Sequence, residues 1–336
     1  MRAPAFWNIK HGRDAAFALR AILWPLSLVY DFVTQQRLKA AKPLRLVIPV
    51  VSVGNLTLGG TGKTPLAQAL RQKLAEKYGK AAIVSRGYKG SLAGPIKVEI
   101  GTHTANEVGD EPLMLAQTGD VYIGKDRALG AQLALGDGIN ALVLDDGHQN
   151  PSLAKDLSIV VVDGDVGFGN CMIFPSGPLR EKPETGLKRA DIVVWIGDKT
   201  HVARDLVDFK GKTYFANITA QKGQYKGKYL AFCGIGRPEK FENTLRKLGV
   251  DLVDLIPFPD HHNFSTHEIA ELRARAANEG ATLITTEKDI SRFGPTQKIG
   301  IEVVKIAIEF ENPSDISDIM QKLSVKMANG SKGATL

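Results

Sequence analysis

The stretch that decides the fold is GNLTLGGTGKTP at residues 54–65, which follows the apolar run LVIPVVSV at 46–53. A strand that ends in a glycine-rich turn and continues into a helix is the setting of a phosphate-binding loop. In that setting, backbone N–H groups and the positive end of the helix face phosphate oxygens. The segment therefore predicts a nucleotide-binding α/β domain.

The loop pattern predicts a contact with nucleotide at each of eight positions. Lys63 is expected to reach the β- and γ-phosphates, and the Thr64 hydroxyl is expected to bind Mg²⁺. Thr57 departs from the strict pattern, which has glycine there. A glycine-rich turn before an ordinary helix is the structural alternative, and the complete GGTGKT string disfavours it. The predicted nucleotide-binding residues are Thr57, Leu58, Gly59, Gly60, Thr61, Gly62, Lys63 and Thr64.

A pair of acidic residues follows another apolar run. The string ALVLDDGHQ at 141–149 places Asp145 and Asp146 directly after a strand pattern. Together with Thr64, these carboxylates predict a Mg²⁺ site, in which one holds the metal and the other orients water or a lysine. A turn built from Asp-Asp-Gly is the structural alternative. The division of labour between the two aspartates stays open.

Apolar runs rich in valine and isoleucine alternate with helical patterns, which indicates a mostly parallel sheet with helices on both faces. We predict a phosphate-loop ATP-binding domain at 45–215, a smaller α/β lobe at 216–326 that closes the active-site cleft, and a flexible tail at 327–336. The expected strands lie at 46–53, 81–84, 141–144, 157–162, 192–196, 229–233, 250–258, 282–286 and 300–308, and the expected helices at 64–79, 110–117, 237–248, 266–279 and 313–324.

Composition and charge exclude several classes of protein. The 336 residues are 43% hydrophobic and 24% charged, which excludes a mainly disordered chain and a polytopic membrane protein. Two separated cysteines exclude a disulfide framework and a cysteine-rich zinc site. Residues 1–45 carry eight basic and two acidic residues, and so hold most of the net charge of +7. A nucleic-acid-binding domain would spread this charge over its fold, so we expect an anionic membrane surface as the partner and no nucleic acid.

Residues 1–44 are predicted to form a membrane-associating helix. Within the apolar stretch 15–33, Arg20 and Pro25 disfavour an ordinary spanning helix. No clear small-x-small site follows the stretch, which disfavours a cleaved signal peptide. We expect a helix lying in the membrane interface, with a span and a helix docked on the protein's own core as alternatives. One narrow polar stripe on this helix contains Arg13, Arg20, Ser27 and Thr34, spaced by seven residues, with Asp31 beside them.

Two other classes of phosphate-loop protein fit less well. GTPases read guanine with N-K-x-D, whereas the nearest string, TEKD at 286–289, has lysine directly before aspartate. Membrane-associated partitioning ATPases carry an extra lysine in the loop, at the position that Leu58 occupies. Both comparisons favour a kinase.

Seven motifs taken together resemble the lipid A kinase family, tetraacyldisaccharide 4'-kinase. Thr57 is normal for that family, whereas His148 stands where the family usually has phenylalanine. Taken singly, the motifs have simpler explanations, such as an N-cap at Asp110 or a solvated ion pair at Arg180 and Glu181. In chain order from 54 to 289 they are G-N-L-T-L-G-G-T-G-K-T-P, S-R-G-Y, V-G-D-E-P, D-D-G-H-Q, P-x-G-x-L-R-E, F-x-D-H-H and T-x-K-D.

The resemblance implies transfer of the ATP γ-phosphate to the 4'-hydroxyl of tetraacyldisaccharide 1-phosphate, which gives the bis-phosphorylated lipid A precursor, lipid IVA. ATP use and the scarcity of cysteine favour the cytoplasmic side, so with the N-terminal helix we expect a peripheral or monotopic enzyme on the cytoplasmic face of the inner membrane. The resemblance also implies Asp110 as the base, hydrogen-bonded to His261 of the second lobe, with Lys63 as a further catalytic residue. The substrate-binding residues it implies are Arg86, Arg180 and Glu181, and either arginine is suited to the 1-phosphate.

Two other functions remain as alternatives. A membrane-associated phosphate-loop ATPase that acts as a nucleotide switch for a protein partner would hydrolyse ATP without lipid. A non-catalytic nucleotide-binding scaffold would tolerate the loss of Asp110.

Overall fold

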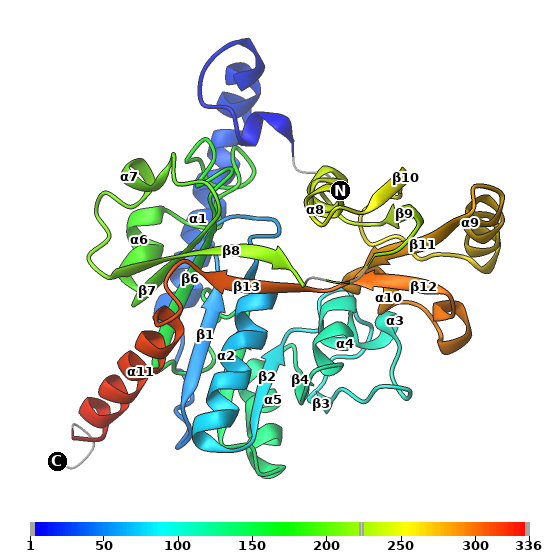
Figure 1. The fold of residues 1–336 in the computed structure, drawn as a ribbon. Coiled ribbons are helices and arrows are strands. Elements are labelled where there is room, and N and C mark those ends of the chain that lie inside the picture. The colour runs from blue at the N-terminus through cyan, green and yellow to red at the C-terminus, as the bar shows by residue number, and fades with distance from the viewer. Residues whose placement is uncertain (1–3, 222, 224, 333–336) are drawn as a thin grey trace.

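The computed structural model describes residues 4–221, 223 and 225–332, which form two lobes and a long N-terminal helix (Figure 1). The first lobe is built on a nine-stranded sheet with the order β13-β8-β7-β6-β1-β5-β2-β4-β3. Neighbouring strands are parallel except in the pairs β13–β8 and β3–β4. The strands are β1 (Val50–Gly54), β2 (Ala81–Ser85), β3 (Ile96–Lys97), β4 (Val121–Ile123), β5 (Ala141–Asp145), β6 (Leu157–Asp163), β7 (Ile192–Ile196), β8 (Lys212–Ala220) and β13 (Ile306–Phe310).

Helices cover both faces of this sheet, and for that reason its central strands are apolar along their whole length. Every residue of β1, β5, β6 and β7 is buried. One face packs against α2 (Lys63–Tyr78), α4 (Asp110–Ala116) and α11 (Asp315–Lys332). The opposite face packs against α5 (Arg127–Gly136) and α6 (Pro183–Lys188). Two short helices, α3 (Ala105–Val108) and α7 (Val202–Asp205), lie in loops.

The second lobe is a four-stranded parallel sheet with one long helix on each face. Its strand order is β10-β9-β11-β12. Apolar side chains of α8 pack on one face of this sheet, and those of α9 pack on the other. Its elements are β9 (Lys228–Cys233), α8 (Pro238–Lys247), β10 (Asp251–Pro257), α9 (Thr266–Asn278), β11 (Ala281–Thr286), α10 (Glu287–Ile290), the 3-10 helix η3 (Pro295–Lys298) and β12 (Ile301–Val304). The predicted α/β architecture, with its smaller second lobe, is confirmed.

The chain returns to the first lobe earlier than the boundaries drawn from the sequence. The apolar run 300–308, expected as one strand, is divided at Lys305 between β12 of the second lobe and β13 of the first. Nothing in the pattern of a continuous apolar run indicates that its two halves join different sheets. Residues 306–332 therefore lie on the first lobe, and α11 extends into the segment expected as a tail. Residues 333–336 of that tail lie outside the described residues.

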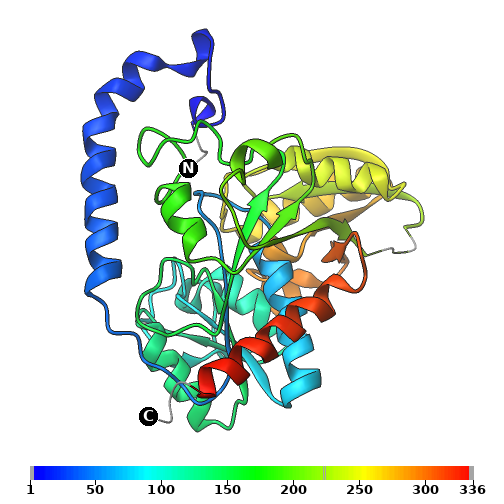
Figure 2. The same cartoon turned by 90° about the vertical axis from the view of Figure 1, so that its left-hand side faces the viewer.

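The N-terminal helix α1 (Phe17–Ala40) runs along the outside of the first lobe, with the 3-10 helices η1 (Ala5–Trp7) and η2 (Arg13–Ala15) before it (Figure 2). Its buried residues are polar. The Arg20 guanidinium donates hydrogen bonds to the carbonyl oxygens of Phe6, Ile9 and Lys10. Ser27 Oγ donates to the Ile173 carbonyl oxygen at 2.8 Å. At Arg20 and Ser27, the polar stripe predicted from the sequence thus faces the protein.

The apolar side of α1 faces away from the protein, which inverts the usual arrangement of a surface helix. By length and composition, α1 is the one helix among the described residues that is long and apolar enough to cross a membrane. Only 11% of its apolar window is buried against the protein. This leaves the apolar side without a protein partner in the described structure. The nine exposed large apolar side chains are Phe17, Leu19, Ile22, Trp24, Leu26, Leu28, Val29, Phe32 and Val33.

Candidate active site

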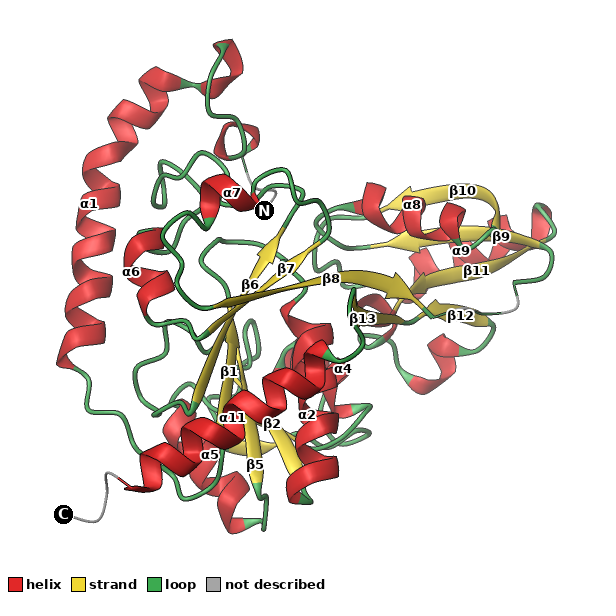
Figure 3. Ribbon diagram, turned by 60° about the vertical axis from the view of Figure 1, so that its left-hand side comes forward, coloured by secondary structure: helices red, strands yellow, loops and turns green. Residues whose placement is uncertain are grey.

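Residues 55–62 form the turn between β1 and α2, at the carboxyl edge of the large sheet, and Lys63 and Thr64 open α2 (Figure 3). Gly62 comes directly before α2 with φ of 85°. A Cβ atom at this position would lie 2.7 Å from the Ile196 side chain, so both the backbone and the space require glycine. No side chain caps the start of α2. The N–H groups of its first turn are therefore left for an anion.

A second loop pairs with the start of the phosphate loop and brings Arg180 to it. Leu58 N donates to the Pro178 carbonyl oxygen at 2.7 Å, and Arg180 N donates to the Leu56 carbonyl oxygen at 2.8 Å. The Arg180 guanidinium in turn donates to both Asp146 carboxylate oxygens, at 3.0 and 2.8 Å. Backbone hydrogen bonds between the phosphate loop and the loop that contains Pro178 therefore determine the position of Arg180.

Asp145 and Asp146 differ sharply in their electrostatic surroundings. Burial raises the pKa of Asp145 to about 7, with further contributions from Glu111 and Asp146. Burial would also raise the pKa of Asp146, but Lys63 and Arg180 outweigh it and lower that pKa to about 2. Lys63 Nζ lies 3.6 Å from Asp146 Oδ1. Asp146 is therefore an ionised partner of two cations, whereas Asp145 has no cation in direct contact among the described residues.

This donor set suits Mg²⁺. The available ligands are the Thr64 hydroxyl and the two carboxylates, and Mg²⁺ prefers one or two carboxylates completed by water and phosphate oxygens. Asp145 ends β5, the strand next to β1, so its carboxyl group lies at the same sheet edge as the phosphate loop. Among the described residues no cluster of three or more His, Cys, Asp or Glu side chains forms a site for a more demanding metal. A cation beside Asp145 would also offset the burial of its charge.

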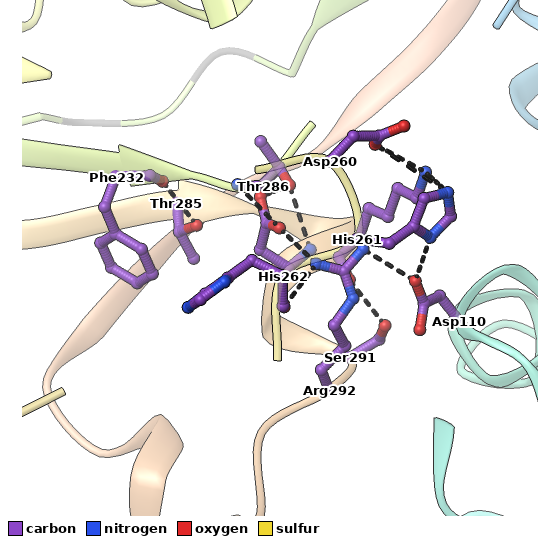
Figure 4. Close-up of polar contacts among 12 residues, drawn as sticks. Asp110, Phe232, Asp260, His261, His262, Thr285, Thr286, Ser291 and Arg292 are labelled. Carbon is purple, nitrogen blue, oxygen red and sulfur yellow. Dashed lines mark hydrogen bonds and ion pairs between the residues drawn. The ribbon is translucent and has the colours of Figure 1, made fainter. Parts of the chain in front are cut away.

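The second lobe meets the first at Asp110 (Figure 4). Asp110 opens α4, and His261 lies in the loop after β10. His261 Nδ1 is 2.6 Å from Asp110 Oδ2, and His261 Nε2 is 3.3 Å from Lys288 Nζ. A carboxylate only accepts and an ammonium only donates, so this pairing favours a hydrogen on Nδ1 and a lone pair on Nε2.

Arg292 is a third member of this contact. Its guanidinium is buried, and it lies 2.8 Å from Asp110 Oδ2 and 2.8 Å from Asp289 Oδ1. Burial would raise the pKa of Asp110, but hydrogen bonds from His261 and Arg292 outweigh it and lower the pKa to about 2. Sequence reasoning missed Arg292. The sequence feature that could have indicated Arg292 is its place three positions after Asp289 of the T-x-K-D motif.

The remaining predicted residues lie in three different settings. Arg86 is exposed at the end of β2 and makes no hydrogen bond or ion pair within the described part of the chain. Burial and the nearby Arg86 lower the pKa of Arg127, a further arginine of this edge that the sequence did not reveal, to about 10. Glu181 is fully buried, where it accepts hydrogen bonds from Gln149 and Arg189. Its expected contact with substrate does not fit this burial, because the carboxylate holds the surrounding loops together.

His148, which stands in place of the family's phenylalanine, lies below the phosphate loop. Its ring nitrogens are 3.1 Å from Ser158 Oγ and 3.0 Å from the Gly186 carbonyl oxygen. Burial and nearby arginines lower the pKa of His148 to about 3, so the ring is neutral. Gly54 allows the close approach, because a Cβ atom there would lie 2.5 Å from the His148 Cβ. The residue packs inside the first lobe and does not line the site.

Comparison with known proteins gives the same family by three routes. A model of the family described as tetraacyldisaccharide-1-P 4'-kinase matches residues 19–324. The tetraacyldisaccharide 4'-kinase of Maricaulis maris is 42% identical over 327 residues, which is 96% of each chain. That of Parvibaculum lavamentivorans is 44% identical over 299 residues, 87% of each chain. The crystal structure of LpxK from Aquifex aeolicus in complex with ATP matches with a TM-score of 0.74 and 26% identity, covering 91% of this chain and 99% of that one.

Proposed function

The chain belongs to the tetraacyldisaccharide-1-P 4'-kinase family, and from that premise we propose that it is an ATP-dependent kinase of lipid A biosynthesis. It transfers the γ-phosphate of ATP to the 4'-hydroxyl of a tetraacyldisaccharide 1-phosphate, and the product is lipid IVA. The observation that carries this proposal is the contact of Asp110 with His261 across the two lobes, beside a complete phosphate loop. A lipid-independent ATPase has no need of such a pair.

On the nucleotide side, Lys63 and the first turn of α2 supply positive charge and N–H donors to the phosphates. Phosphoryl transfer depends on positioning and on electrostatic stabilisation of the equatorial oxygens. Asp146 holds Lys63 and Arg180 near one another, so the two cations stay directed at one place before ATP arrives. Thr64 and Asp145 are the residues that would hold Mg²⁺, which would supply positive charge to offset that of the phosphates.

On the acceptor side, Asp110 accepts the proton of the sugar hydroxyl. Its Oδ2 receives hydrogen bonds from His261 and Arg292, while its Oδ1 receives none within the described residues. The free oxygen is thus the one that can accept from the substrate. With a pKa of about 2, Asp110 is a weak base. In a loose transition state the attacking hydroxyl gains little from a strong base, so orientation by His261 and Arg292 matters more than basicity.

The lipid substrate requires the cleft to lie at a membrane surface, and α1 supplies the attachment. Its apolar side is exposed, while Arg20 and Ser27 on the opposite side are bound to the protein. An interfacial helix fixed by its polar side holds the first lobe at a constant distance from the bilayer. We infer a monotopic enzyme at an anionic membrane surface, on the cytoplasmic face because ATP is supplied there. Exposed Arg86 is the candidate for the substrate's 1-phosphate.

The test is incubation with [γ-³²P]ATP, Mg²⁺ and tetraacyldisaccharide 1-phosphate in mixed micelles, followed by separation of the lipids. We expect the label to appear in a single lipid that is more polar than the substrate. We also expect ATP consumption to depend on added lipid. Fast ATP hydrolysis without lipid, and no labelled lipid, would favour the nucleotide switch over the kinase.

A further inference from the structure

The two lobes touch at a second place, on the opposite side of the phosphate loop from Asp110. In the large sheet β1 has two neighbours, β5 toward the Asp110 side and β6 on the other side. Asp163 is the last residue of β6, and its carboxylate receives Arg237 of the second lobe. The same guanidinium donates to the Gly60 carbonyl oxygen of the phosphate loop at 3.3 Å. No motif used to identify the family contains Asp163 or Arg237.

Lys240 completes this contact. Its ammonium lies 3.3 Å from Asp163 Oδ1 and 2.5 Å from Asp165 Oδ2. Lys240 lies one turn after Arg237, so both cations point from the start of α8 toward the same carboxylates. We call the group formed by Asp163, Asp165, Arg237, Lys240 and the Gly60 carbonyl the nucleotide-side contact.

The charges of this contact are distributed unequally between the lobes. The Asp163 side chain is 6% exposed, whereas those of Arg237 and Lys240 are 41% and 47% exposed. If the lobes separate, the cations gain water, whereas Asp163 loses both cations and keeps one hydrogen bond among the described residues, from the Asp165 backbone N–H. A buried carboxylate that loses its cations is costly. The contact therefore favours the arrangement in which the second lobe lies against the phosphate loop.

A short segment of the second lobe connects this contact to the acceptor site. The Gly234 carbonyl oxygen accepts a hydrogen bond from His261 N at 3.0 Å, and Gly234 N donates to Asp289 Oδ1 at 3.1 Å. Asp289 also binds Arg292. Arg237 follows Gly234 by three residues, so the backbone that holds His261 and Arg292 in place is continuous with the residue that grips the phosphate loop.

We propose that Arg237 is a positioning residue that ties the second lobe to the phosphate loop, and so sets His261 and Arg292 against Asp110 when nucleotide orders that loop. The proposal rests on the kinase function given above. Arg237 acts through closure of the lobes, and the sugar hydroxyl and the γ-phosphate react without touching it.

The test compares Arg237→Ala with Arg237→Lys and with a control on the same helix, Arg246→Ala. Arg246 pairs with Glu242 inside α8, at 2.7 Å, and its side chain has no hydrogen bond or ion pair with the first lobe among the described residues. Closure is measured by the distance between two nitroxide labels, one on the exposed Cys171 of the first lobe and one on Glu271→Cys of the second, since Cys233 is buried. The same proteins are assayed for kcat and for KM of ATP and of lipid.

We expect Arg237→Ala to lower kcat on the order of tenfold, because it breaks a pair with a buried carboxylate through a partly exposed cation. Its label distances should become longer and broader, Arg237→Lys should restore part of both effects, and Arg246→Ala should match the parent. High salt should weaken closure in the parent and change Arg237→Ala little.

An Arg237→Ala protein with the distances and kcat of Arg246→Ala would overturn the proposal, and so would a loss of kcat without a change in distance. The label distances do not require a lipid acceptor. If the parent protein transfers no phosphate to lipid while Arg237→Ala still opens the lobes, the lobe contact stands and the proposed acceptor is wrong.

Discussion

Removing Asp110 and His261 singly and together tests whether the two side chains act as one unit. Their hydrogen bond of 2.6 Å joins a carboxylate to a ring nitrogen. A hydrogen bond to a charged group contributes about 1.5–3 kcal/mol, which corresponds to a factor of roughly 10 to 150 in rate. His261→Ala should therefore lower kcat by a factor in this range. Asp110→Ala should cost on the order of 100-fold, the lower end of the contribution of a positioned base.

The double variant decides between a unit and two independent residues. With Asp110 absent, His261 has no carboxylate to orient, so the double variant should lose about as much kcat as Asp110→Ala alone. ATP affinity should stay near that of the parent in all three proteins, because neither residue contacts the phosphate loop in the described structure. His262→Ala is the matched control, since His262 Nε2 pairs with Glu268 at 2.9 Å within the second lobe.

The assay is steady-state lipid phosphorylation at saturating ATP, with folding checked by circular dichroism. Losses that multiply in the double variant would show that Asp110 and His261 act separately. A tight dependence of the parent protein on zinc would instead favour the histidines as metal ligands.

Four further predictions follow from individual contacts. Lys63→Ala should lower kcat by about 100-fold or more through lost charge at the γ-phosphate, and a folded variant with unchanged turnover would remove the phosphate-loop mechanism. Arg292→Gln should raise the pKa of Asp110 from about 2, because burial is then opposed mainly by His261; the acid limb of kcat/KM should move to higher pH, and an unmoved limb would contradict this. Ile22→Glu with Phe32→Glu should reduce flotation with anionic vesicles and raise KM for lipid more than KM for ATP, whereas the exposed control Val207→Glu should not. His148→Phe should lower the melting temperature, since it leaves two buried partners unpaired at about 1–3 kcal/mol, with kcat unchanged; a changed KM for lipid would place this residue in the substrate path instead.

The fold class and the family could be predicted from the sequence because both depend on patterns within short segments. A strand, a glycine-rich turn and a helix are contiguous in 46–79, and the comparisons confirm the kinase family that the motifs indicated. The order of strands and the return of β13 to the first sheet depend on contacts between distant segments. The run that is divided at Lys305 contains no signal for them.

The same distinction holds within the site. Asp110 and His261 were found through motifs, and their roles stay predictions until the variants are measured. The family resemblance implied Glu181 as a substrate-binding residue, but its side chain lies inside the protein, where it accepts hydrogen bonds from Gln149 and Arg189. Arg292 and Arg237 have no motif of their own, and only the packing of the two lobes brings them to Asp110 and to the phosphate loop.

The sequence likewise could not predict that the polar stripe on α1 faces the protein. Periodicity identifies a stripe on a helix but does not say which side meets the protein. In the structure Ser27 bonds to the loop at 173–176, and Arg20 bonds to the segment before the helix. The apolar majority of the circumference is therefore left without a protein partner in the described structure.

The position of the transferred phosphate tests the central claim most directly. Tetraacyldisaccharide 1-phosphate is incubated with the protein, ATP and Mg²⁺, and the purified lipid is analysed by ³¹P NMR with coupling to the sugar protons. We predict a second phosphomonoester coupled to the proton at the 4' carbon, with one ATP consumed per lipid. A lipid that keeps its single 1-phosphate while ATP is hydrolysed, or a new phosphate at another carbon, would contradict the account.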